Sequence, residues 1–140
     1  MKAELQLFLH VLGAIVLFGA TAAAAVLALA ARRREQQLPL ARAAFWTLAA
    51  VATPGWVLML AFGSWTKSEQ GWPDGVRWID IGVAVSDGGL ILLLVAAAAS
   101  WVWTRRPAGG WPVTVVALAS GVQLVAIAVA WWVMSAKLPT

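Results

Sequence analysis

Long apolar stretches alternate with short polar segments along this chain. Four stretches, at about 5–31, 43–63, 78–104 and 112–136, contain almost no charged residues, and most of the charges lie between them. Crossing roughly 30 Å of hydrocarbon takes about 20 apolar residues in a helix, so each stretch is long enough. We therefore predict an all-α fold, an integral membrane four-helix transmembrane bundle, with residues 1–140 forming a single transmembrane domain.

Arginine and proline positions mark where these helices end or bend. The first stretch ends at Arg32–Arg34, and the third ends at Arg105 and Arg106. Pro112 suits the first turn of the fourth helix, where its missing N–H would have no partner in any case. Pro54 lies in the middle of the second helix, where a proline removes one backbone hydrogen bond, so we predict a kink there.

Small residues recur at helical spacing within three of the four stretches. In lipid, helices associate mainly through close packing and interhelical hydrogen bonds, which small residues allow. We therefore expect packing faces at these positions: Gly19 and Ala23; Gly82, Ser86 and Gly89; and Ala117 and Gly121.

The composition agrees with a membrane protein and excludes several other classes. Hydrophobic residues make up 62% of the chain and charged residues 11%, whereas soluble domains have roughly 45–50% and 25%. Cysteine is absent, so disulfides, thiolate metal sites and cysteine nucleophiles are excluded. The excess of Lys and Arg, 10 against 6 Asp and Glu, forms no basic face with interleaved aromatics, so we expect no nucleic-acid partner.

Charge and tryptophan positions predict an orientation in the membrane. Six arginines flank the first and third connections, which are expected to be cytoplasmic by the positive-inside rule, with both termini outside. Tryptophan prefers the headgroup level of a bilayer. Nine of the 10 Trp residues fall near predicted span ends: Trp46, Trp101, Trp103 and Trp111 on the inner side, and Trp65, Trp72, Trp78, Trp131 and Trp132 on the outer side. Trp56 falls in mid-span, and we expect it inside the bundle.

Residues able to bind a metal or haem fall in the outer half of the predicted bundle, one on each helix. At 1.5 Å per residue, His10 lies about 8 Å and Asp87 roughly 13 Å below the outer membrane edge. Met59 and Met134 lie near the outer ends of the second and fourth helices. An imidazole can ligate haem iron or copper, and thioethers can be additional soft ligands. The alternative interpretation is a half-solvated histidine, with methionines that fill gaps between helices.

Two further polar side chains lie deep in the predicted spans. A carboxylate in hydrocarbon is costly unless it is paired, hydrated or protonated, so Asp87 is a candidate functional residue. It would orient His10 or mark a proton or ion path. Alternatively, it forms an interhelical hydrogen bond to His10, Thr53 or Gln123. For Gln123, near mid-depth in the fourth helix, we expect a structural hydrogen bond.

Two segments carry a family resemblance. The opening LFLHVLGAIVLFGA (Leu7–Ala20), the arginine-rich turn after it and ATPGWVLMLAFGSW (Ala52–Trp65) together resemble a family of small bacterial four-helix predicted integral membrane proteins of unknown function. The resemblance implies a bacterial cytoplasmic membrane protein. More distantly, His10 is similar in its place on the first helix to a histidine of copper-resistance and membrane protoporphyrinogen oxidase type proteins. That likeness implies haem or copper handling near His10.

Three functions follow as hypotheses. The first is a non-catalytic accessory or structural subunit, embedded in the lipid bilayer and bound to other membrane subunits or to itself. No nucleophile–base pair, phosphate loop or dinucleotide motif is present to indicate an enzyme. The second is a haem- or copper-binding membrane protein that uses His10. The third is a small transporter or channel that depends on Asp87.

Overall fold

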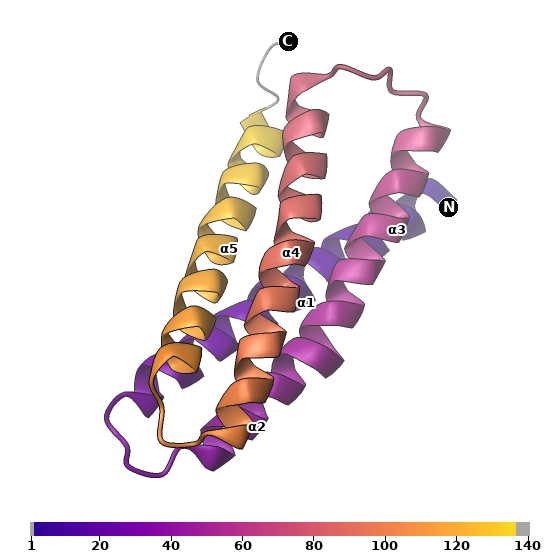
Figure 1. Ribbon diagram of the computed structural model, residues 1–140. Helices are drawn as coiled ribbons and strands as arrows, with labels where there is room; N and C mark the ends of the chain where they lie inside the picture. The colour runs from indigo at the N-terminus through magenta and orange to yellow at the C-terminus, as the bar shows by residue number, and fades with distance from the viewer. Residues whose placement is uncertain (1, 137–140) are drawn as a thin grey trace.

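The protein is an all-α bundle of four long helical segments (Figure 1). The computed structural model describes residues 2–136. The first helix, α1, runs over Lys2–Ala31, the second segment over Leu38–Glu69, α4 over Arg77–Arg105 and α5 over Trp111–Ala136. All four are long and apolar enough to cross a membrane, and each contains one of the four predicted stretches. The second segment starts and ends outside its predicted bounds of 43–63.

The second segment is one continuous helix with a π-helical turn inside it. It consists of α2 (Leu38–Trp46), the π-helix η1 (Thr47–Ala52) and α3 (Thr53–Glu69). The backbone N–H of Thr53 donates to Leu48 O, and its side-chain Oγ1 donates to the same carbonyl over 3.0 Å. Pro54 follows at once and has no N–H to continue the ladder. The irregularity expected at the proline is thus a widened turn placed just before it.

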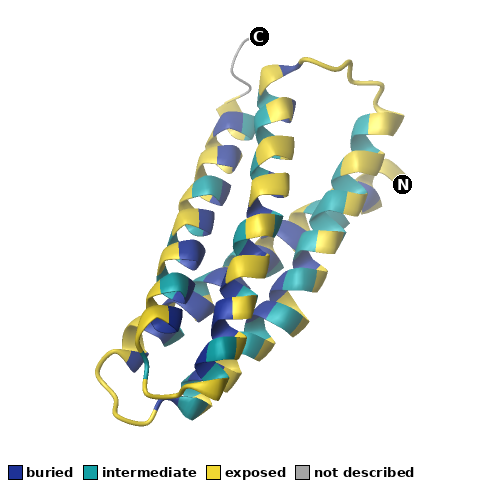
Figure 2. Cartoon of the chain, viewed as in Figure 1, coloured by how far each residue is buried: buried dark blue, intermediate teal, exposed yellow. Residues whose placement is uncertain are grey.

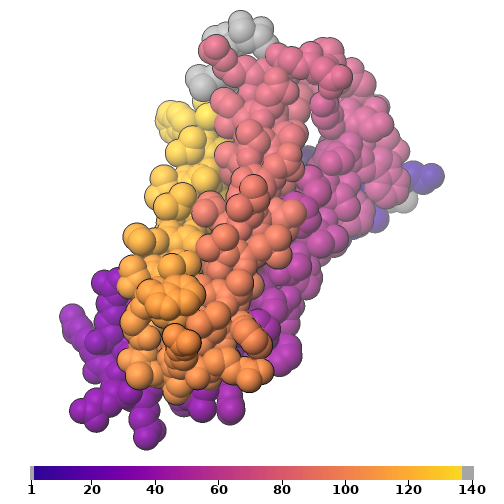
Figure 3. All heavy atoms as spheres, in the orientation of Figure 1, coloured from indigo at the N-terminus to yellow at the C-terminus, as the bar shows by residue number. Residues whose placement is uncertain are grey.

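The helices pack as two pairs that separate toward one end. α1 packs against α3, α4 packs against α5, and α1 also contacts α5, where Phe18 stacks on Trp131. At the end that holds the two arginine-rich connections, α2 packs against both α1 and α4. Toward the opposite end α3 and α4 diverge, and the connection 70–76 bridges them above an opening (Figure 3).

Alanine is the most frequent residue of the core, and many large apolar side chains are exposed. Figure 2 shows that buried and exposed positions alternate along every long helix. Around Leu17, Leu48 and Leu93, one cluster is built mainly from alanines of α1, η1, α4 and α5. A second cluster surrounds Trp103 near the arginine-rich end. The exposed leucines, valines and isoleucines form the surface that a bilayer covers, so the protein is a multi-pass membrane protein.

Tryptophan side chains at the arginine-rich end are exposed with one exception. Trp46, Trp101 and Trp111 are exposed near the arginine-rich end, and Trp56 packs against the core as expected. Trp103 lies at the same level as this belt, but its side chain is fully buried. Its indole therefore serves packing and a hydrogen bond inside the bundle, as described below, instead of contacting headgroups.

Candidate functional site

The candidate ligands named above lie at three separate places in the bundle. His10 is in the contact between α1 and α3, Met134 is in the contact between α4 and α5, and Asp87 is on the outside of α4. Within residues 2–136, no group of three or more His, Cys, Asp and Glu side chains is close enough to hold a metal ion together.

His10 is tied to the backbone of α3. Its Nδ1 lies 2.6 Å from Met59 O. Because a carbonyl only accepts hydrogen bonds, Nδ1 must carry the proton and donate it. A Cβ added to Gly63, one turn further along α3, would lie 2.7 Å from the same Nδ1. The glycine at 63 therefore makes room for the imidazole ring, a requirement that the sequence pattern did not reveal.

α1 and α3 approach each other very closely next to His10. A Cβ added to Gly13 would lie 2.5 Å from Met59 N and 2.7 Å from Gly55 O. A Cβ added to Gly55 would lie 2.9 Å from Leu17 N. The two glycines thus let the backbones of α1 and α3 touch. This crossing holds His10 against its carbonyl partner.

The small residues predicted as packing faces divide into two groups. Gly82 and Gly89 lie in contacts between α4 and α5, against Met134 and Gln123 respectively. A Cβ added to Gly19 or Gly121 would meet no atom within 4 Å. Those two glycines therefore contribute no close helix contact within the bundle.

The two methionines differ in their surroundings. Met59 is partly buried against the core cluster, and its backbone carbonyl accepts the His10 hydrogen bond. Met134 lies with its terminal methyl group on Gly82, where any Cβ would overlap it. The Met134 side chain thus occupies the space beside Gly82 between α4 and α5.

Asp87 is exposed on α4, and it makes no hydrogen bond or ion pair to any residue between 2 and 136. Of its three suggested partners, His10 donates to Met59 O, Thr53 donates to Leu48 O, and both amide atoms of Gln123 lack a partner. The helix repeat places Asp87 in a stripe of exposed apolar residues formed by Val83, Ile91 and Leu94. The carboxylate therefore belongs to the outer surface of the bundle.

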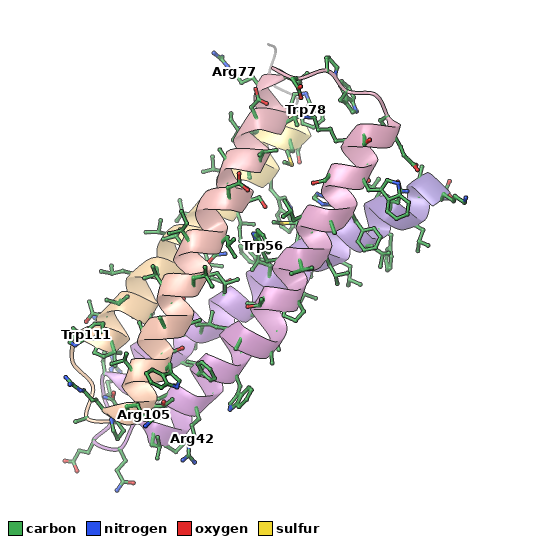
Figure 4. All side chains as sticks on the ribbon, turned by 45° about the vertical axis from the view of Figure 1, so that its right-hand side comes forward. Arg42, Trp56, Arg77, Trp78, Arg105 and Trp111 are labelled. Carbon is green, nitrogen blue, oxygen red and sulfur yellow. The ribbon has the colours of Figure 1, made fainter. Side chains whose placement is uncertain are left out.

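Gln123 lies in the interior, at the contact between α5 and α4. It is 1% exposed, and neither its amide nitrogen nor its amide oxygen has a partner within residues 2–136. Ser86 on α4 is also buried with an unpartnered hydroxyl, and its backbone carbonyl accepts the Trp56 Nε1–H over 2.9 Å. Figure 4 shows Trp56 between the two diverging helices. The predicted structural hydrogen bond of Gln123 is not formed with another residue of the bundle.

The arginine-rich end contains a polar clasp that sequence reasoning missed. Gln37 donates through Nε2 to Ala31 O at 2.6 Å and to Arg34 O at 3.1 Å, and its Oε1 accepts from Trp103 Nε1 at 3.0 Å. Gly109, whose φ is +92°, lies so close that a Cβ there would be 3.0 Å from the same Oε1. One buried amide therefore joins the first arginine-rich connection to α4 and lies against the second connection.

The six arginines that frame this clasp lie at one end of the molecule. Arg42 and Arg105 are seen there in Figure 4, and Arg77 lies at the opposite end. All six side chains are exposed, and Arg105 also lies 4.8 Å from the ring centre of Trp101. Guanidinium groups beside exposed tryptophans are typical of the headgroup level of a bilayer.

Comparison of the chain with protein-family models, with curated proteins and with solved structures finds no match.

Proposed function

We propose that this protein is an accessory subunit of a larger complex in the bacterial cytoplasmic membrane, with its arginine-rich end in the cytoplasm and both termini outside. The partner is a transmembrane helix that carries a basic or hydrogen-bond-donating side chain at the depth of Asp87. This helix lies on the α4 stripe formed by Val83, Asp87, Ile91 and Leu94. The bacterial location in this proposal rests on the resemblance of the sequence to small bacterial four-helix membrane proteins.

The exposed carboxylate of Asp87 is the observation that carries this proposal. A charged aspartate near the centre of a bilayer costs about 2.5–3.5 kcal/mol on insertion scales. The described part of the chain offers it no partner, and its neighbours on the stripe are apolar. Gly88, the next residue of α4, is also exposed, so the surface beside the stripe carries no bulky side chain at this depth. A donor on that helix would remove most of the penalty.

Co-purification from native membranes tests the proposal. Wild-type protein is expected to carry a stoichiometric membrane partner through a mild detergent. Asp87→Asn keeps hydrogen bonding and should retain part of that partner, whereas Asp87→Leu should lose it. The matched control is Asp80→Asn, which removes an exposed carboxylate two turns away in the first turn of the same helix.

Two outcomes would contradict the proposal, one for its binding surface and one for its accessory role. Equal partner recovery from wild type and Asp87→Leu would show that this stripe is not the binding surface. A wild-type protein that purifies alone and conducts ions in a pH-dependent way, with the current lost in Asp87→Asn, would instead favour the transporter or channel hypothesis.

A second candidate function, haem or copper binding, rests on the orientation of His10. Metal-ligating histidines usually donate their other ring N–H to a carbonyl or carboxylate, which fixes the tautomer and the ring. The hydrogen bond from Nδ1 to Met59 O does this for His10 and leaves Nε2 as the nitrogen that would bind iron or copper. The thioether of Met59, on the helix that His10 contacts, would be the additional ligand. When bound, the metal would supply electron-transfer or ligand-binding chemistry.

An optical spectrum and a metal assay test this second candidate. Purified protein from cells supplied with haem and copper should show a Soret band or stoichiometric copper. The signal should vanish in His10→Ala and weaken in Met59→Leu. Met134→Leu, on the other helix pair, should leave the signal unchanged. A colourless and metal-free wild-type sample would refute cofactor binding.

A further inference from the structure

Gln123 has an unusual position for an amide side chain. Its neighbours one turn away on α5, Ala119 and Ile127, both belong to the core cluster around Leu17 and Leu93. The side chain is 1% exposed, and both of its amide atoms lack partners within residues 2–136. Burial of an amide without hydrogen bonds is strongly unfavourable, and hydrocarbon offers no substitute partner. The amide therefore requires a small partner inside the bundle.

The neighbouring face of α4 carries a glycine and a further polar group. A Cβ added to Gly89 would lie 3.5 Å from Gln123 Nε2, so the amide lies against a position without a side chain. Ser86, three residues earlier on the same face of α4, has a buried hydroxyl without a partner. Ser120 on α5, three residues before Gln123, has a buried and unpartnered hydroxyl as well. Unsatisfied hydroxyls thus lie about one turn from the contact of Gly89 and Gln123 on either side: Ser86 toward the outer end and Ser120 toward the arginine-rich end.

We propose that Gln123 and Ser86 bind internal water in the middle of the membrane. The set contains both hydrogen-bond donors and acceptors and carries no charge, so it fits water better than a cation or an anion. A water molecule can accept from Gln123 Nε2 and donate to the amide oxygen or to a serine hydroxyl. Buried waters typically make about three such bonds to groups that would otherwise be unsatisfied.

The route to this site starts from the outer end of the bundle. α3 and α4 diverge there and leave the opening that Figure 3 shows below the connection 70–76. Trp56 lies between the two helices (Figure 4), where its Nε1–H binds the carbonyl of Ser86. The proposed path for water runs past Trp56 to the α4 face that carries Ser86 and Gly89. This inference does not depend on whether α4 binds a partner subunit.

Water-edited solid-state NMR of the isotope-labelled protein in lipid bilayers tests the proposal. The Gln123 amide signal is identified by its loss in Gln123→Leu. Exposed Gln36 is the wet reference. Thr21 is the dry reference, because it is fully buried in α1 and its hydroxyl donates to Leu17 O over 2.7 Å. Magnetisation from water should reach the Gln123 amide several-fold faster than it reaches Thr21, and close to the rate for Gln36.

The variants decide whether the water is shared between the helices. In Gln123→Leu, transfer from water to Ser86 should fall to the level of Thr21. If that variant does not fold, Ser86→Ala is the second test, and transfer to the Gln123 amide should fall there. If transfer from water to the wild-type Gln123 amide is as slow as transfer to Thr21, the proposal is overturned. Transfer that is unchanged in Ser86→Ala would overturn the sharing of water between Gln123 and Ser86.

Discussion

Gln37 makes three hydrogen bonds that hold the arginine-rich end together. In Gln37→Ala, the indole N–H of Trp103 would remain buried without its acceptor, whereas the carbonyl of Ala31 would still accept from the Arg34 N–H. An orphaned buried group costs about 1–3 kcal/mol, so we expect a loss of unfolding free energy of at least that size. Denaturant titration of the protein in detergent measures it. Gln36→Ala, an exposed neighbour, should change stability by less than about 0.5 kcal/mol.

Asp74 and Lys67 form an exposed ion pair at the outer end, with 2.9 Å between Oδ1 and Nζ. The hydrogen bond from Lys67 and its positive charge lower the pKa of Asp74 below the ordinary value of 3.8. The folded state therefore gains stability from Asp74 above pH 3.8 and loses it as the pH falls through the lowered pKa. NMR titration of the carboxyl carbon should give a pKa below 3.8, and Lys67→Met should return it toward that value. Equal pKa values in both proteins would contradict the pairing.

The packing of whole elements depends most on the glycine crossing of α1 and α3. In Gly13→Ala the new methyl group would meet backbone atoms of Met59 and Gly55, which cannot rotate away. The helices must then separate, so we expect a loss of about 1–3 kcal/mol and a weaker bond between His10 and Met59. Thermal unfolding and the ring 15N shifts of His10 measure the two effects.

Gly19→Ala is the matched control for this crossing. Gly19 is on the same helix, and an added Cβ meets no atom within 4 Å. Alanine is a better helix former than glycine by about 0.8–1.0 kcal/mol, so this variant should be neutral or slightly more stable. Equal destabilisation by the two substitutions would show that the backbones of α1 and α3 do not touch at Gly13.

Sequence reasoning identified the elements but not the faces that they present to one another. Hydropathy located the four spans, because a run of apolar residues is visible in any orientation. The spacing of small residues pointed to Gly19 as a packing residue, whereas Gly13 is the one at the close contact. These helices are apolar on all sides, so no polar face indicates which side is outward. The depth of Trp103 was predicted, whereas its inward orientation follows from Gln37, which lies 66 residues away in sequence.

For the candidate site, the sequence predicted the depth of each residue in the membrane but not its neighbours, because it does not show which helix faces meet. Counting residues along each helix gave the depth of His10, Asp87 and Gln123. Their hydrogen-bond partners depend instead on how far each helix is rotated about its axis. His10 meets a backbone carbonyl because Gly63 leaves space for its ring, and Asp87 lies about 100° of helix turn away from buried Ser86. A single sequence contains no direct signal for such rotations.

The distribution of arginine over the whole molecule predicts which end lies in the cytoplasm. Because the chain has no cysteine, single cysteines report on each side without background. Ser68→Cys places an exposed thiol at the outer end of α3, and Ala108→Cys places one in the connection 106–110. In intact cells, a membrane-impermeant maleimide should label Ser68→Cys and should label Ala108→Cys only after lysis. The opposite pattern would invert the proposed topology and place Asp74, Lys67 and the opening between α3 and α4 on the cytoplasmic side.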